Sequence, residues 1–282
     1  MTKTMPARRP QFKPKLGQHF LNDDAAAQRI VEALSPQGGA LEIGPGKGVL
    51  TALLARRFPW LIAIELDKVL AAQLRMQFAL ASNVEIIEGD ILKMDIGKLF
   101  APKPGLSRPG LALLPEPVQV VGNLPYYITS DILLRLFEFR QYFSTIVVMV
   151  QKEVADRLAA PPGGSEYGLL SATAQLYCKV EKLFTIPPTS FSPPPKVYST
   201  VVRMTLADRL AKLQVPEPQF IAFLKLCFGL KRKTLWNNLK PHYAAEVLKA
   251  AFSQARVKPA VRAEVLTLEQ MAALFRVLQG AA

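Results

Sequence analysis

The stretch Leu41-Glu42-Ile43-Gly44-Pro45-Gly46-Lys47-Gly48 decides the fold, because an apolar strand runs here into a glycine-rich turn and the apolar residues 49–54 follow as a helix. Glycine lets the backbone pass close to a ligand, and the start of a helix offers unbonded N–H groups to an anion. Val49 stands where a dinucleotide fingerprint has a third Gly or Ala, which disfavours a nicotinamide cofactor. The stretch predicts the first strand, turn and helix of a ligand-binding α/β fold.

Acidic side chains end the next two apolar runs. Glu65 follows residues 61–64 and lies about twenty residues after the glycines, where doubly wound folds place an acid on a ribose diol. Asp90 follows residues 84–88 and is a candidate acceptor for the amino group of an adenine ring. One such acid alone is more often a solvated charge at a strand end. Two acids and a glycine turn at successive strand ends indicate a ligand site, since open α/β sheets bind ligands there.

The next apolar run, Val118 to Val121, leads into Asn123-Leu124-Pro125-Tyr126. A nucleobase amino group shares its lone pair with the ring, so acceptors must draw the nitrogen toward tetrahedral geometry before it can attack. The Asn123 side-chain carbonyl and the Leu124 backbone carbonyl are candidate acceptors. Pro125 stiffens the turn, and Tyr126 offers a flat face to a base. Alone, these residues fit a plain strand-to-turn transition equally well; beside the glycine turn and the two acids they predict a pocket for an aromatic amine.

The motifs described above, together with one at Lys15–Asn22 and one at Pro187–Val197, resemble in type and order those of the S-adenosylmethionine-dependent rRNA adenine dimethyltransferase family, known in bacteria as KsgA or RsmA. The resemblance covers the chain from about Lys13 to the C-terminus. It agrees with the alternation of strands and helices, which argues for a parallel sheet covered on both faces. We therefore expect an α/β fold, a Rossmann-like methyltransferase sheet with helices on both faces, plus a small all-α C-terminal domain. The motifs are Lys15–Asn22, Glu42–Gly46, Ile64–Asp67, Gly89–Asp90, Asn123–Tyr126 and Pro187–Val197.

The resemblance also implies roles for single residues and a reaction. Phe191, in the proline-braced loop 187–197, is expected to place its ring on the far side of the target base from Tyr126. Many family members carry Asn where this chain has His19, and both side chains can donate and accept a hydrogen bond. The implied reaction is dimethylation of the N6 amino groups of two adjacent adenosines in the 3′-terminal hairpin of 16S rRNA, with a role in small-subunit ribosome biogenesis. The expected contacts with S-adenosylmethionine are His19, Leu21, Gly44, Gly46, Glu65, Asp90 and Asn123, and the expected catalytic residues are Asn123, Leu124, Pro125, Tyr126 and Phe191.

Positive charge gathers at the two ends of the chain. The formal net charge is +13, of which residues 1–20 hold +5 (five Lys or Arg, no acids) and residues 206–282 hold +7 (twelve Lys or Arg against five acids), which leaves +1 for the middle. Two basic segments around a balanced body predict two contacts with a phosphate backbone. The alternative for residues 231–233 is a solvated helix face. The candidate RNA-binding residues are Arg8, Arg9, Lys196, Lys231, Arg232 and Lys233.

We predict three segments. They are a basic arm with the start of the cofactor motif (1–20), a methyltransferase domain (21–205) with a proline-rich insertion (101–117), and a helical RNA-binding domain (206–282). Thr267 to Gln270 fits a capping box, and Phe220, Phe223, Leu224 and Phe228 fall on one helical stripe. Helices are expected at 23–34, 48–58, 67–78, 130–139 and 152–158, a buried strand at 145–150, and an antiparallel edge pair at 180–186 and 197–205.

Several absences narrow the function. Cys178 and Cys227 are far apart and form no metal-spaced motif, so we expect reduced thiols and no metal. His19 and His242 are the only histidines, so few residues could serve as the histidine of a Ser-His-Asp triad. No apolar stretch reaches membrane-spanning length and the basic N-terminus has no signal-peptide core, so we expect a cytoplasmic monomer that binds no membrane. Its expected partner is 16S rRNA within the small ribosomal subunit or its precursor.

Three alternatives stay open. A 23S rRNA adenine methyltransferase of the antibiotic-resistance type would share the pocket. A DNA adenine methyltransferase uses a similar motif, usually with Pro at the position of Leu124. A non-catalytic RNA-binding assembly factor could retain the fold. The last alternative is disfavoured because binding RNA requires none of Asn123, Tyr126, Glu65 and Asp90.

Overall fold

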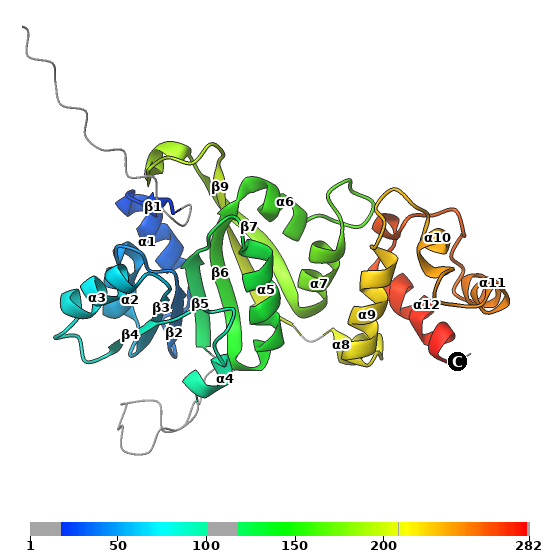
Figure 1. Cartoon of the computed structure of the whole chain (residues 1–282), viewed down its shortest axis with the longest axis horizontal. Helices are drawn as coiled ribbons and strands as arrows, with labels where there is room; N and C mark the ends of the chain where they lie inside the picture. The colour runs from blue at the N-terminus through cyan, green and yellow to red at the C-terminus, as the bar shows by residue number, and fades with distance from the viewer. Residues whose placement is uncertain (1–17, 101–117, 208, 281–282) are drawn as a thin grey trace, which may run out of the picture.

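Figure 1 shows the computed structural model of the chain, which describes residues 18–100, 118–207 and 209–280. Most of the basic arm, with Arg8 and Arg9, and the insertion 101–117 therefore lie outside the described residues. A sheet with flanking helices forms one end of the molecule, and a group of helices forms the other. The predicted α/β class is confirmed, and every described helix or strand after Leu206 is a helix.

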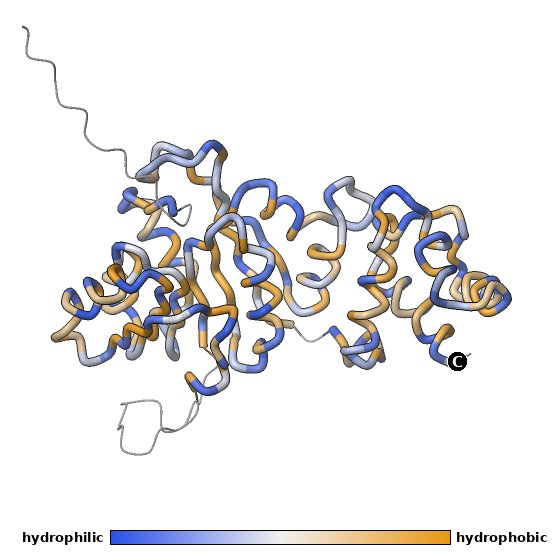
Figure 2. Tube along the Cα trace, viewed as in Figure 1, coloured by the Kyte–Doolittle hydropathy of each residue, from blue (hydrophilic) through white to orange (hydrophobic). Residues whose placement is uncertain are grey.

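The central sheet has seven strands in the order β4-β3-β2-β5-β6-β9-β7. The first five are parallel, and β9 and β7 add to β6 as an antiparallel pair that ends the sheet. This confirms the predicted edge pair. Because β2, β3 and β5 are buried on both faces, they are largely orange in the hydropathy colouring of Figure 2. The strands are β2 Ala40–Ile43, β3 Leu61–Glu65, β4 Val84–Glu88, β5 Val118–Asn123, β6 Phe143–Gln151, β7 Cys178–Ile186 and β9 Ser199–Leu206.

Helices cover both faces of this sheet. On strand β5, Val120 packs into the core beneath α5, whereas its neighbour Val121 packs into the core beneath α1 and α2. Two of these helices have a side-chain cap at the N-terminus, since Asp23 accepts from the N–H of Ala26 and Asp67 accepts from that of Val69. The helices are α1 Asp24–Glu32, α2 Val49–Arg57, α3 Lys68–Gln77, α4 Ile96–Leu99, α5 Thr129–Glu138, α6 Lys152–Leu158 and α7 Leu169–Tyr177.

The C-terminal helices share a core with the sheet. One continuous cluster of buried side chains runs from the strands through α7 to α9, where the Phe220 and Phe223 rings each lie 5.4 Å from the ring of Phe275. The capping box is confirmed, because Thr267 N–H donates to Gln270 Oε1 and Gln270 N–H donates to Thr267 Oγ1. The helices are α8 Leu210–Leu213, α9 Glu217–Cys227, α10 Leu235–Leu239, α11 Ala245–Gln254 and α12 Leu268–Gly280.

A second, two-stranded sheet joins the start of the described chain to the proline loop. Strand β1 (Phe20–Leu21) pairs antiparallel with β8 (Phe191–Ser192), and the N–H of Asn22 donates to the carbonyl of Ser190 at 2.9 Å. The Ser190 hydroxyl in turn donates to Asp23 at 2.7 Å. This pairing connects two segments about 170 residues apart in the sequence, and no local pattern predicted it.

Candidate active site

The glycine turn lies between β2 and α2 and exposes its backbone to a pocket. Gly44 and Gly46 have φ of +67° and +58°, the left-handed region that side chains other than glycine rarely adopt. A Cβ on Gly46 would lie 3.0 Å from the ring of Phe20, so glycine lets β1 pack over the turn. Lys47 adds a charged contact, with Nζ 4.9 Å from the centre of the Phe20 ring.

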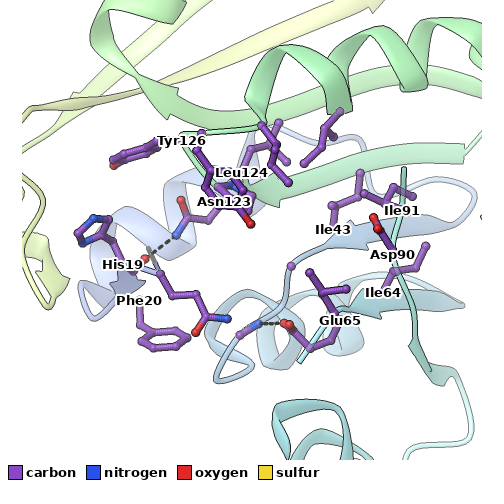
Figure 3. Close-up of a pocket in the computed structure, with 18 of the residues that line it drawn as sticks. His19, Phe20, Ile43, Ile64, Glu65, Asp90, Ile91, Asn123, Leu124 and Tyr126 are labelled. Carbon is purple, nitrogen blue, oxygen red and sulfur yellow. Dashed lines mark hydrogen bonds between the residues drawn. The ribbon is translucent and has the colours of Figure 1, made fainter. Parts of the chain in front are cut away.

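Glu65 links the end of β3 to this turn. Glu65 is 3% exposed, and its Oε2 accepts from the N–H of Gly46 at 3.0 Å (Figure 3). Its Oε1 accepts from the N–H of Asp67 at 2.9 Å. Each carboxylate oxygen can accept more than one hydrogen bond, so both keep capacity for a ligand hydroxyl. The buried carboxylate is thus already held in place by the backbone.

Asp90 follows the end of β4 on the other side of β3. Its Oδ1 accepts from the N–H of Leu92 at 3.0 Å, and Lys93 Nζ lies 3.6 Å from Oδ2. Ile43, Ile64 and Ile91 surround the carboxylate in the pocket (Figure 3). An apolar slot with one carboxylate at its rim suits a flat heteroaromatic ring that carries an amino group.

Asn123 ends β5, and its amide has one defined orientation. Nδ2 donates to the backbone carbonyl of His19 at 2.8 Å, which turns Oδ1 toward the side of the pocket where Tyr126 lies (Figure 3). The neighbouring N–H of Leu124 donates to Met149 on β6 at 3.1 Å. Within the described parts of the chain, neither Asn123 Oδ1 nor the Leu124 carbonyl oxygen accepts a hydrogen bond. Two acceptors at this corner are therefore available to an amine.

The turn after Asn123 is held by hydrogen bonds from its backbone and its tyrosine. The Pro125 carbonyl accepts from the N–H of Ile128 and from the buried Thr129 hydroxyl at 2.9 Å. Tyr126 is half-buried and shares a hydrogen bond of 2.6 Å with the hydroxyl of Ser199 on β9. Burial raises the pKa of Tyr126, and the bond to Ser199 offsets part of that rise, so the phenol stays neutral.

His19 contacts this turn with its side chain as well as its backbone. Its ring stacks on Tyr126 with centroids 5.6 Å apart and an angle of 28° between the planes. Nδ1 donates to the carbonyl of Pro193 in the proline loop at 2.8 Å. One residue thus connects the first described segment, the Asn123 turn and the proline loop.

Beneath the glycine turn lies a carboxyl group for which the sequence suggested no role. Glu42 is 1% exposed, and its Oε2 accepts from the Thr51 hydroxyl on α2 at 2.7 Å. The pKa of Glu42 is raised to about 8, because the raising effects of burial and of the nearby Glu65 outweigh the lowering effect of the hydrogen bond from Thr51. At neutral pH Glu42 is therefore mostly the neutral acid.

The pocket brings together nine of the predicted site residues. The lining residues that the sequence analysis did not predict are mostly apolar neighbours of the predicted ones, such as Leu66 after Glu65 and Ile91 after Asp90. Their position next to a strand end is the feature of the sequence that could have identified them. The predicted residues in the lining are His19, Gly44, Gly46, Glu65, Asp90, Asn123, Leu124, Pro125 and Tyr126, and the added ones are Gln18, Phe20, Ile43, Ile64, Leu66, Gly89, Ile91, Tyr127, Ile128 and Ile132.

Two predicted site residues do not line this pocket. Leu21 and Phe191 face each other across the β1–β8 pair and lie in an apolar core with Ile186 and Val201, and Phe191 is only 2% exposed. Leu21 lines a small hollow behind the glycine turn instead. The expectation of a presented Phe191 ring is not met here, because strand pairing turns this side chain inward, and the ring beside Tyr126 is that of His19.

The candidate RNA-binding residues that the structure describes do not line this pocket. Lys196 is exposed in the proline loop, and Lys231, Arg232 and Lys233 are exposed in the turn between α9 and α10 rather than on a helix face. In the described ranges, no three His, Cys, Asp or Glu side chains are placed to share a metal ion. The described helices also include none that is long and apolar enough to cross a membrane.

Comparison with known proteins gives consistent matches. The family model for "Ribosomal RNA adenine dimethylase" matches residues 9–280. "Ribosomal RNA small subunit methyltransferase A" of Koribacter versatilis is 51% identical over 273 residues, with 96% of each chain covered. The protein of the same name from Synechococcus elongatus is 41% identical, with 94% of this chain and 93% of the relative covered.

Solved structures show the same fold. A dimethyladenosine transferase from Plasmodium falciparum superposes with a TM-score of 0.71 at 24% identity, covering 91% of this chain and 96% of that one. The 23S rRNA methyltransferase ErmE superposes with a TM-score of 0.66 at 27% identity, covering 92% and 99%. The sheet, its helices and the C-terminal helices are thus an arrangement seen in enzymes that carry these names.

Proposed function

The chain belongs to the ribosomal RNA adenine dimethylase family, and from this premise we propose that it transfers methyl groups from S-adenosylmethionine to the N6 amino groups of two adjacent adenosines in the 3′-terminal hairpin of 16S rRNA. The observation that carries the proposal is the orientation of Asn123, whose free amide oxygen faces a pocket with carboxylates at its other end. The relatives that are 39–52% identical bear small-subunit names, which favours this substrate over 23S rRNA.

The residues at the strand ends fit S-adenosylmethionine. Ile64 and Ile91 would flank the adenine ring, with Asp90 accepting from its amino group, and Glu65 would accept from the ribose hydroxyls. The space beside Gly44 leaves room for the methionine part of the cofactor. A Cβ at Gly44 would have as its nearest neighbour the backbone carbonyl oxygen of Asn123, at 3.7 Å. When bound, the cofactor supplies a methyl group made electrophilic by the sulfonium.

The chain's own contribution is positioning and electrostatics. Asn123 Oδ1 and the Leu124 carbonyl oxygen would accept the two hydrogens of the adenine amino group and direct its lone pair toward the methyl group. Both oxygens also stabilise the positive charge that develops on the nitrogen. The hydrogen bond from Asn123 Nδ2 to His19 fixes this geometry before the substrate arrives.

The reaction needs no strong base at this corner. Amide oxygens accept a hydrogen bond but are too weakly basic to remove a proton, so the proton leaves to water after transfer has made the nitrogen acidic. A first methyl leaves one hydrogen on the amine, and one of the two acceptors is enough to orient it for a second transfer. Stacking on Tyr126 would hold the base in both rounds.

Basic residues outside the pocket would hold the rRNA. We assign this role to Arg8, Arg9, Lys196, Lys231, Arg232 and Lys233, of which the last four are exposed and the first two lie outside the described residues. Each would contact the phosphate backbone, so binding should weaken with salt. We propose a monomer that acts in the cytoplasm on the small subunit or its precursor and so takes part in ribosome biogenesis.

The test is to incubate the protein with labelled S-adenosylmethionine and unmodified small subunits, large subunits or duplex DNA, and then to map the labelled nucleotide. We expect label only in small subunits, on two adjacent adenosines as N6,N6-dimethyladenosine. Label in the large subunit or in DNA would favour one of the alternative methyltransferases. RNA binding without any label would indicate an assembly factor that has lost catalysis.

A further inference from the structure

A largely apolar groove of about 600 Å³ crosses the C-terminal helices, at the end of the molecule away from the sheet (Figure 1). It lies between the start of α10, helix α11 and the segment 257–260 that follows α11. The N–H of Leu235 donates to the carbonyl of Val261 at 2.7 Å, and the N–H of Val257 donates to that of Phe252 at 2.9 Å, so backbone bonds hold the three parts together. None of the residues that line the groove belongs to the candidate active site.

Trp236 supplies an aromatic surface in this groove. Its side chain is half-buried, and its ring meets the ring of Phe252 with centroids 5.5 Å apart and an angle of 68° between the planes. This contact fixes the plane of the indole while part of the ring stays exposed. Val257 and Pro259 add apolar wall. A held, partly exposed indole in an apolar groove is a surface on which a second flat ring can stack.

The segment that forms the groove is strongly basic. Residues 229–262 hold eight Lys or Arg against one acid, which accounts for the whole net charge of +7 of residues 206–282. Lys249 pairs with that acid, Glu246, at 3.0 Å, and Arg262 pairs with Glu264 at 3.6 Å. This surface therefore suits a polyanion. The other six cations are exposed and form no ion pair within the described ranges, namely Lys231, Arg232, Lys233, Lys240, Arg256 and Lys258.

Unpaired cations flank the groove on two sides. Lys258 stands between the lining residues Val257 and Pro259, and Lys233 directly precedes the lining residue Thr234. Among the described residues, no acid lines the groove. The centres of protein–protein interfaces are poor in Lys, whereas sites for single-stranded nucleic acid combine aromatic faces with cations. The surroundings of the groove therefore favour RNA over a protein segment as its occupant.

We propose that this groove binds one unpaired nucleotide of the RNA, at a distance from the target adenosine. The base stacks on Trp236, and Lys233 and Lys258 hold the phosphates on either side of it. Proteins contact RNA bases mainly in such unpaired stretches, because the edges of paired bases are hidden in the A-form helix. The inference rests on the proposed function only in requiring that RNA is bound.

The fluorescence of Trp236 tests this contact directly. The only other tryptophan, Trp60, is 9% exposed and packs beside Phe100 in the core, so a change of emission on binding reports on Trp236. A single-stranded oligoadenylate should quench the emission of the full-length protein, and an RNA duplex of the same length should not. The variant Trp236→Phe keeps an aromatic ring for the contact with Phe252 and should lose the quenching.

Two matched charge changes on α11 test the same site by affinity. Ser253 is exposed and lines the groove, whereas its exposed neighbour Gln254 does not. Ser253→Glu places an anion where the nucleotide would lie, so it should weaken binding of the single strand about fivefold or more. Gln254→Glu introduces the same charge outside the groove and should weaken it less than about twofold. Lys258→Ala should lower the slope of log affinity against log salt by about one.

Two results would overturn the proposal. They are a single strand that binds without quenching Trp236, and an equal loss of affinity in Ser253→Glu and Gln254→Glu; either would leave the groove to a protein partner. These assays need no methyl transfer, so the two failures are distinguishable. Labelled RNA without quenching refutes only this inference, and quenching without label refutes only the proposed function.

Discussion

The pocket has two flanks that are assembled differently. The cofactor flank, formed by Gly44, Gly46, Glu65 and Asp90, takes its groups from the ends of neighbouring parallel strands. The target flank, formed by His19, Asn123, Tyr126 and the loop 190–193, is held by contacts between segments 104 and 174 residues apart. The first flank follows from the order of strands alone, whereas the second needs the whole chain to be folded.

This difference suggests that the two flanks govern two different properties, the affinity for the cofactor and the rate of methyl transfer. The cofactor flank presents carboxyl groups held by backbone N–H groups, so it should govern cofactor affinity. The target flank presents neutral acceptors whose orientation depends on a hydrogen bond to His19, so it should govern the rate of transfer. Variants that change one property without the other test whether the division is real.

The largest effect is expected for Asn123→Ala. Removing one preorganised group that stabilises charge in the transition state costs about 10²–10³ in rate, so single-turnover methyl transfer should fall by that factor. The dissociation constant for RNA should change less than about twofold, because phosphate contacts elsewhere supply most of the affinity. Rates from rapid quench and affinities from filter binding provide the two measurements.

Gln119→Ala is the matched control. Gln119 is a buried amide on the same strand, and its side chain bonds the backbone of Ser35 and Gln37 away from the pocket. This variant should lose stability but keep the transfer rate per folded molecule. An undiminished rate in Asn123→Ala, or an equal fall in Gln119→Ala, would remove the special role of Asn123.

Glu42→Gln is expected to remove a pH dependence of stability. The pKa of Glu42 is raised from 4.5 to about 8, so the folded protein keeps this proton up to about pH 8 while the unfolded chain loses it near pH 4.5. The free energy of unfolding of the unsubstituted protein therefore falls between these values, by on the order of a few kcal/mol. Gln keeps the acceptor for Thr51 without titrating, so the variant should gain relative stability as the pH rises.

Urea unfolding at pH 5, 6.5 and 8 measures this gain. Glu32→Gln serves as the control, because Glu32 is an exposed acid on α1 and should show no growing difference. Parallel stability curves for the Glu42→Gln variant and the unsubstituted protein would mean that the buried carboxyl is not neutral at pH 7.

Glu65→Ala should weaken cofactor binding with the fold retained. A hydrogen bond to a charged group contributes about 1.5–3 kcal/mol, which corresponds to roughly 10-fold to 150-fold in the dissociation constant. Isothermal titration calorimetry with S-adenosylmethionine gives this value directly. Glu88→Ala is the control, because Glu88 stands beside Glu65 in the strand register but does not line the pocket. Equal affinities for the two variants would exclude Glu65 from the cofactor site.

The smallest effect is expected for Tyr126→Phe. The ring that stacks on His19 remains, and only the 2.6 Å hydrogen bond to Ser199 is lost. A neutral hydrogen bond contributes about 0.5–1.5 kcal/mol, so we expect a small loss of stability and less than about a tenfold loss of rate. Tyr127→Phe, an exposed neighbour, provides the comparison in the same assays. A loss as large as that of Asn123→Ala would show that the hydroxyl takes part in the chemistry.

Much of the fold follows from local sequence patterns. Apolar runs predicted the strands, and two of the expected helices begin at residues whose side chains cap them, Asp23 and Asp67. Helix α7, Leu169–Tyr177, escaped prediction because it is buried on most sides and shows no clear polar face. The β1–β8 pair escaped because each strand has two residues, which is too short for a periodic pattern.

The two flanks also differ in how well the positions of their residues could be predicted from the sequence. Glu65 and Asp90 were predictable, because a strand end fixes where each side chain lies. The positions of Leu21 and Phe191 were not, because a motif fixes the order of residues along the chain and not the face that strand pairing turns inward. Glu42 was missed for another reason, since its raised pKa comes from burial and from a neighbouring charge in space.

The most direct test of the account is a crystal structure of the protein with S-adenosylmethionine bound. We predict that the ribose hydroxyls will lie on Glu65 and the adenine amino group on Asp90. The sulfonium methyl should point at the space in front of Asn123 Oδ1, with the bond from Asn123 to His19 retained. A cofactor bound away from the strand ends, or an Asn123 amide turned so that its nitrogen faces the methyl group, would contradict the account.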